Sequence, residues 1–123
     1  MSEYTKHLTP RPELRERIID TAVKAFAAQG IKSITMDDIA TSLGISKRTL
    51  YEVFPDKETL LEECILRGQK EGDEYLKNVL ATSENVLEVL LKCYQRSIEK
   101  FHATNKKFFE DIKKYPKAYK RSE

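Results

Sequence analysis

The sequence predicts an all-α protein: a three-helix bundle containing a helix-turn-helix, followed by further helices. Three observations support this fold class. Apolar residues recur at spacings of three and four along most of the chain, which places them on one face of an α-helix. Gly30 and Gly44 stand where helical patterns stop, and glycine favours the left-handed backbone of a helix end. Residues 34–57 divide at Gly44 into two short helical stretches, the pattern of two helices joined by a tight turn.

Composition and charge limit the class of protein. The chain has 123 residues, of which 40% are hydrophobic and 34% charged, as in one folded domain or two small ones. No apolar run approaches the roughly 20 residues that span a bilayer, and the polar N-terminus is unlike a signal peptide. We therefore expect a cytoplasmic protein without a membrane partner. The net charge of +2 gives no overall basic field, and the strongest basic bias lies at residues 106–121.

The first two segments are an arm and a helix. Residues 1–11 are expected to form a flexible arm, which either reaches the minor groove of a duplex through Lys6 and Arg11 or has no role. A helix follows from about residue 13 to residue 29, with one apolar face made of Leu14, Ile18, Ala22, Ala25 and Phe26.

The helix-turn-helix is delimited by residues that cap and stop helices. Thr35 caps its first helix, with Asp38 three residues later as the reciprocal partner of a capping box. Gly44 ends that helix and allows the positive φ of a sharp turn. Ser46 caps the second helix, and Pro55 ends it because the residue before a proline disfavours helical angles.

The second helix of this motif turns polar side chains toward water at its start. At 100° per residue, Lys47, Arg48, Thr49 and Tyr51 lie on or beside the face opposite the apolar one. Such a helix suits the DNA major groove, where arginine pairs with guanine and threonine contacts a thymine methyl or a phosphate. Glu52 either accepts from cytosine or pairs with Arg48 one turn back.

Three further helices are expected, at about residues 56–81, 85–104 and 106–115, with Pro116 ending the last. The helix at 85–104 is apolar on most sides and therefore needs partners on most sides. We expect an exposed apolar surface on the last two helices, which drives association with another copy or makes the protein marginally soluble.

The helix at 56–81 contains three residues that run against helical preference. Lys57 lies in its first turn, where acids are favoured; a bound phosphate explains it, and a solvated lysine is the alternative. Gly68 and Gly72 stand one turn apart in its interior and indicate a bend or a close helix crossing, unless the helix tolerates them or breaks.

The cysteines and histidines do not form a reactive or metal-binding pattern. Cys64 and Cys93 fall within apolar helical patterns without CxxC spacing, so we expect reduced, buried thiols. His7 and His102 have no companions at metal-ligand spacing and are expected at the surface. We expect no cofactor, no metal site and no enzymatic activity, because the chain also lacks a phosphate-binding loop and a nucleophile–base pattern.

About half of the chain resembles the DNA-binding region of the TetR family of bacterial transcription regulators. The residues that carry the resemblance are Phe26, Gly30, Thr35, Ile39, Ala40, Leu43, Gly44, Thr49, Leu50, Tyr51, Phe54, Lys57, Leu60 and Leu61. Val53 departs from the pattern, since the family often has an aromatic residue or histidine there that reaches a phosphate.

The resemblance implies a domain organisation. Residues 12–55 would be the DNA-binding domain, with the motif at about 35–54. Residues 56–123 would be an incomplete C-terminal helical domain for regulation and dimerisation, whether the chain is truncated, a fragment or naturally short.

The resemblance also implies a function: a sequence-specific, ligand-responsive repressor that binds a palindromic operator in double-stranded DNA as a homodimer. Lys47, Arg48 and Thr49 would contact bases, and Thr35, Tyr51 and Lys57 would hold phosphates. A small apolar effector would bind in the second domain and shift the long helix. Its expected lining, for which plain core positions are the alternative, is Tyr75, Tyr94, Ser97 and Phe101.

A second hypothesis is a helical protein-interaction module without DNA recognition. It accounts for the near-neutral net charge and the apolar helix at 85–104. It does not account for the exposed polar face of the helix that begins at Lys47.

Overall fold

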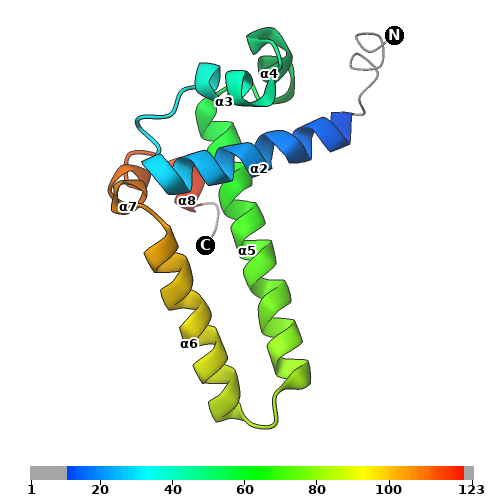
Figure 1. Cartoon of the computed structure of the whole chain (residues 1–123), viewed down its shortest axis with the longest axis vertical. Coiled ribbons are helices and arrows are strands. Elements are labelled where there is room, and N and C mark those ends of the chain that lie inside the picture. Colours follow the sequence, from blue (N-terminus) through cyan, green and yellow to red (C-terminus); the bar gives the residue numbers. More distant parts are fainter. Residues whose placement is uncertain (1–10, 121–123) are drawn as a thin grey trace.

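The computed structural model describes residues 11–120, and all of their regular secondary structure is α-helical (Figure 1). This confirms the predicted fold class. The helices are α2 (Arg11–Gln29), α3 (Met36–Leu43), α4 (Lys47–Val53), α5 (Lys57–Thr82), α6 (Val86–Ala103), α7 (Lys106–Ile112) and α8 (Pro116–Lys120). Most of the predicted arm lies outside the described residues. Arg11 does not belong to an arm, because α2 already begins there, with Pro12 in the first turn, where a proline costs no helical hydrogen bond.

The core lies where α2, α3 and α4 meet the first turns of α5. Leu50 of α4, Phe54 and the α5 residues Leu60 and Leu61 are at most 2% exposed. The rest of this core comes mainly from α2 and α3 and includes Leu14, Ile18, Ile19, Ala22, Phe26, Ile31, Ile39 and Ala40. The helix-turn-helix bundle therefore shares its core with α5, as expected of a bundle too small to bury enough apolar surface alone.

Ion pairs fix the crossing of α2 and α5 at the edge of this core. Arg67 of α5 pairs with both Glu16 and Asp20 of α2. One turn nearer the start of α5, Glu63 pairs with Arg15 at 2.9 Å. The long helix is thus tied to the bundle by apolar packing and by charge.

Beyond the bundle, α5 continues without a break and α6 returns beside it (Figure 1). The unbroken course of α5 excludes a helix break at Gly68 or Gly72. Gly68 does not mark a close helix crossing, because a Cβ built there meets no atom within 4 Å. Ser83 caps the C-terminal end of α5 and Asn85 caps the start of α6.

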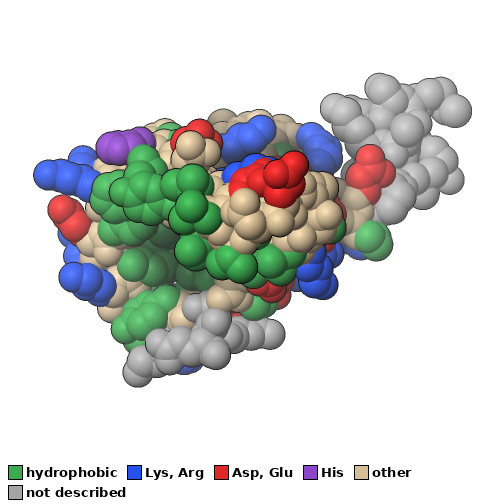
Figure 2. All heavy atoms as spheres, turned by 90° about the horizontal axis from the view of Figure 1, so that it is seen from below, with side chains coloured by type: hydrophobic (Ala, Val, Ile, Leu, Met, Phe, Trp, Pro, Cys, Tyr) green, Lys and Arg blue, Asp and Glu red, His purple; other side chains and the backbone are tan. Residues whose placement is uncertain are grey.

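Within the single chain, α6 exposes the apolar surface that the sequence predicts. None of its residues is buried, and Val86, Tyr94 and Phe101 are 74%, 64% and 62% exposed. Hydrophobic side chains gather over the end of the molecule that α5 and α6 form (Figure 2). Cys93 is only half-buried, so the expectation that both cysteines are core residues holds for Cys64 alone.

The prediction that Pro116 ends the last helix was wrong. A turn separates α7 from α8, and Pro116 begins α8, where a missing N–H is tolerated. Ala118, on α8, is 1% exposed and belongs to the bundle core. The basic segment near the C-terminus therefore folds back onto the bundle instead of trailing away from it.

Candidate nucleic-acid interface

Local hydrogen bonds fix both helices of the helix-turn-helix. The Thr35 hydroxyl accepts from the backbone N–H of Asp38 at 3.1 Å, and the Asp38 carboxylate accepts from the N–H of Thr35 at 2.9 Å. These bonds hold the pKa of Asp38 below its ordinary value. Gly44 takes a φ of 70°, and Ser46 then accepts from the N–H of Thr49 at 3.0 Å. The start of α4 is therefore set by the capping residues that the sequence identifies.

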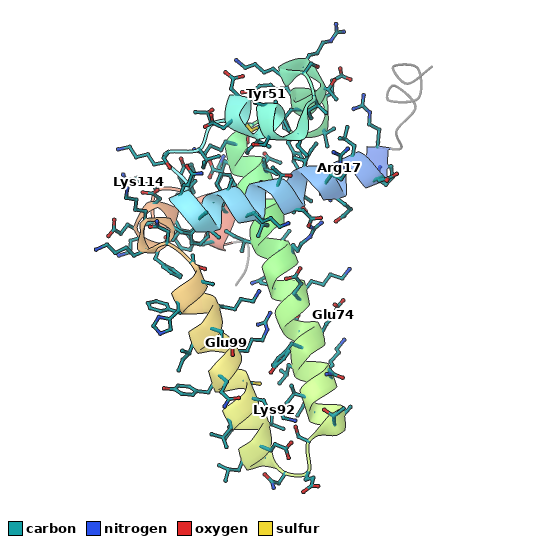
Figure 3. All side chains as sticks on the ribbon, viewed as in Figure 1. Arg17, Tyr51, Glu74, Lys92, Glu99 and Lys114 are labelled. Carbon is teal, nitrogen blue, oxygen red and sulfur yellow. The ribbon has the colours of Figure 1, made fainter. Side chains whose placement is uncertain are left out.

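The polar side chains at the start of α4 lie on the surface. Tyr51 is 41% exposed, and the Arg48 side chain is 91% exposed. Tyr51 lies at the end of the molecule formed by α3 and α4, far from Lys92 and Glu99 on α6 (Figure 3). Lys47 is exposed as well, whereas Thr49 is half-buried with its hydroxyl 2.9 Å from that of Ser46.

Carboxylates hold the cations of this surface in the absence of a partner. Lys47 pairs with Asp37 of α3 at 3.2 Å. Glu52 pairs with Arg48 at 3.6 Å and with Arg11 of α2 at 2.9 Å. Exposed pairs of this kind are worth at most about 1 kcal/mol, so a nucleic acid can replace them at small cost.

The two remaining candidate phosphate contacts, Thr35 and Lys57, differ in how exposed their polar groups are. Thr35 is exposed, and its hydroxyl, which accepts a bond in the capping box, keeps its hydrogen for a further acceptor. The Lys57 ammonium lies 6.0 Å from the ring centre of Tyr115. Burial lowers the pKa of Lys57, while the charges of Asp111 and Asp38 oppose that shift. The Lys57 ammonium therefore lies partly buried against an aromatic ring, not free in solvent.

The four residues expected to line an effector pocket lie on α5 and α6. Tyr94 and Phe101 are exposed on α6, and Phe101 stacks on Phe109 with ring centres 5.2 Å apart. Tyr75 donates to the backbone carbonyl of Lys92 at 3.2 Å. Ser97 is also exposed.

Two contacts that the sequence did not predict join α7 to the bundle. The buried Asp111 accepts from the N–H groups of Ile31 and Lys32, in the segment that leads into the helix-turn-helix. Asn105 donates its own N–H to the carbonyl of Ala27 at 2.7 Å. A signal existed for Asp111, which shares a face with the apolar residues Phe108 and Ile112 and therefore needs a buried partner.

Within residues 11–120, no group of three or more His, Cys, Asp or Glu side chains is placed to hold a metal ion. None of the helices in that part of the chain combines the length and the apolar character that a bilayer-spanning segment needs. The fold and the exposed start of α4 define a helix-turn-helix protein with a surface suited to nucleic acid.

Comparison with known families narrows this class. Residues 18–64 match the family described as bacterial regulatory proteins, tetR family. The HTH-type negative transcriptional regulator IcaR of the biofilm operon icaADBC in Staphylococcus aureus is 33% identical over 72 residues, which are 58% of this chain and 37% of IcaR. The HTH-type transcriptional regulator YhgD of Bacillus subtilis is 31% identical over 101 residues, which are 79% of this chain and 52% of YhgD. The chain belongs to the TetR family of bacterial regulatory proteins.

Solved structures agree with this assignment. A TetR-family transcriptional regulator from Pectobacterium atrosepticum superposes with a TM-score of 0.61 and 28% identity, over 72% of this chain and 46% of that one. A TetR-family protein from Mesorhizobium loti superposes with a TM-score of 0.70 over 91% of this chain and 59% of its own; at 24% identity it supports the fold alone. The chain spans about half of the length of these relatives, or less.

Proposed function

We propose that this chain contains the DNA-binding bundle and the first regulatory helices of a transcriptional repressor that recognises a specific duplex sequence through α4. One observation supports this most strongly. The start of α4 presents exposed Lys47, Arg48 and Tyr51 on a scaffold fixed by caps on both helices of the motif. Side chains near the start of a recognition helix contact base edges in the major groove.

The candidate residues divide into base contacts and phosphate contacts. Arg48 and Lys47 are suited to guanine, and Thr49 to a thymine methyl. Thr35, Tyr51 and Lys57 would hold phosphates, which position a protein on DNA without specifying sequence. Because each cation is paired with a carboxylate or an aromatic ring in the free chain, binding is an exchange of partners.

Repression and dimerisation complete the proposal. IcaR, a relative, is named a negative transcriptional regulator. Two copies would place two α4 helices about 34 Å apart on a palindromic operator, one duplex turn from each other. A small apolar effector that binds the other spacing more tightly would release the DNA, and the protein would act in the cytoplasm.

A protein-interaction module remains the second candidate, because α6 exposes a continuous apolar surface. That surface is also what a dimer of regulators would cover. A repressor binds duplex DNA, whereas an interaction module does not, so DNA binding distinguishes the two functions.

The test begins with selection of bound duplexes from a random pool, followed by fluorescence anisotropy on the selected sequence. We expect Arg48→Ala to weaken binding by about 1–3 kcal/mol and to relax the preference at one base pair. Lys77→Ala is the control, because it removes the same charge from an exposed position in the far half of α5.

Tyr51→Ala is expected to weaken binding to all duplexes alike, whereas Asn78→Ala changes an exposed residue in the far half of α5 and leaves binding unchanged. If neither α4 variant differs from its control, the chain does not recognise DNA through α4, and the interaction module is favoured.

A further inference from the structure

A cavity of about 320 Å³ lies where the DNA-binding bundle meets α6, away from the recognition surface on α4. Four helices supply its walls: α2, α5, α6 and α7. The residues that matter for its chemistry are Val23, Phe26, Ile65, Gly68, Lys100 and Phe108. Its volume falls at the lower end of the range of about 300–1,000 Å³ found for small-molecule sites.

Gly68 accounts for part of this open space. A glycine in the interior of a helix is unfavourable, so its presence in α5 calls for a reason. Neither a helix break nor a close helix crossing supplies one, since α5 is unbroken and a Cβ at position 68 meets no atom within 4 Å. A residue with a side chain at position 68 would fill part of this space, and glycine leaves it open to the cavity.

The walls of the cavity are apolar apart from its rim. Val23 and Phe26 face it from α2, Ile65 from α5 and Phe108 from α7. Lys100 of α6 is exposed and makes no ion pair with another residue in the described part of the chain. An apolar chamber with one free cation at its edge suits a ligand that has an apolar body and a single negative charge.

We propose that this cavity binds a small amphiphilic carboxylate, with its apolar body between α2, α5 and α7 and its carboxylate beside the Lys100 ammonium. The cavity is distinct from the set of Tyr75, Tyr94, Ser97 and Phe101, none of which lines it. The proposal does not depend on DNA binding, so it stands or falls independently of the function proposed above.

The test is a titration of the full chain with sodium octanoate. Binding is monitored by NMR through the methyl resonances of Val23 and Ile65. We expect both sets of methyl signals to shift with a common dissociation constant. Gly68→Leu places a side chain in the cavity and is expected to abolish these shifts. Gly72→Leu, one turn along the same helix and outside the cavity walls, is the matched control and is expected to keep them.

A second variant protects the test against a misfolded Gly68→Leu protein. Ala103→Leu enlarges a wall residue from the α6 side and is also expected to abolish the shifts. Lys100→Gln is expected to weaken octanoate binding about two- to fivefold, the effect of one exposed ion pair, and to leave binding of 1-octanol unchanged.

Three outcomes would overturn the proposal. Octanoate shifts confined to Leu87 and Leu90, on the exposed face of α6, would show adsorption to that face only. Equal binding by folded Gly68→Leu and Gly72→Leu would place the ligand elsewhere. An octanoate affinity that is unaffected by Lys100→Gln would show that the carboxylate does not bind beside the Lys100 ammonium.

Discussion

Replacing Asp111 tests how firmly α7 holds the segment that enters the helix-turn-helix. One oxygen of this buried carboxylate accepts from the N–H of Ile31 at 3.0 Å and from that of Lys32 at 2.8 Å. In Asp111→Ala the buried Ile31 N–H loses a charged acceptor, which costs about 1.5–3 kcal/mol. The Lys32 N–H is partly exposed and regains water, so its loss adds about 1 kcal/mol or less. We expect the free energy of unfolding to fall by about 1.5–4 kcal/mol.

The measurement is urea unfolding followed by circular dichroism, with amide hydrogen exchange as a local probe. Asp111→Asn is the control, because its amide oxygen can accept both bonds while the charge is lost. We expect it to cost about 1 kcal/mol, the difference between a charged and a neutral acceptor. The Ile31 amide should exchange faster in the alanine variant and near the normal rate in the asparagine variant. If Asp111→Ala unfolds like the wild type and the Ile31 amide keeps its protection, these bonds do not hold the segment.

Phosphate binding, thiol reactivity and the pH dependence of stability can each be tested at a single residue. Lys57→Met should weaken binding to all duplexes similarly and reduce the slope of log affinity against log salt by about 1, whereas an unchanged slope would exclude a phosphate contact. Burial raises the pKa of Cys64 to about 12, so at pH 8 iodoacetamide should modify the half-buried Cys93 first, as measured by mass spectrometry of the folded chain. The capping box lowers the pKa of Asp38 in the folded chain. Ionised Asp38 therefore stabilises the fold fully above its ordinary pKa of 3.8, and this stabilisation is lost as the pH falls through the lowered pKa. The thermal midpoint of Asp38→Asn should therefore lie below that of the wild type at pH 7, with the difference vanishing in acid; a difference that is independent of pH would contradict this.

The part of the fold that sequence predicts well depends on short-range bonds. The capping box of Thr35 and Asp38 and the cap of Ser46 on Thr49 each join residues three apart, so local spacing determines them. The exposure of Arg48 follows from helical periodicity alone. These features place the candidate interface without any tertiary information.

What sequence did not predict depends on contacts between distant segments. Asp111 bonds to a residue 80 positions away, and no local pattern reports that distance. Pro116 both ends one helical pattern and can begin the next, and the packing of Ala118 against the core selects the second. The position of Lys57 over Tyr115 likewise depends on how α8 returns to the bundle.

Leu60 and Leu61 are buried in the core that α5 shares with the recognition helix α4. The start of α5 and α4 therefore move together as one rigid body. The 26 residues of α5 make a rod about 39 Å long. A tilt of about 5° about its far end carries its start through about 3.4 Å, which is the rise of one base pair along duplex DNA. In the proposed dimer, an angular change too small to alter any packing at the far end of α5 is therefore enough to move the two halves of the protein out of register with an operator by a whole step.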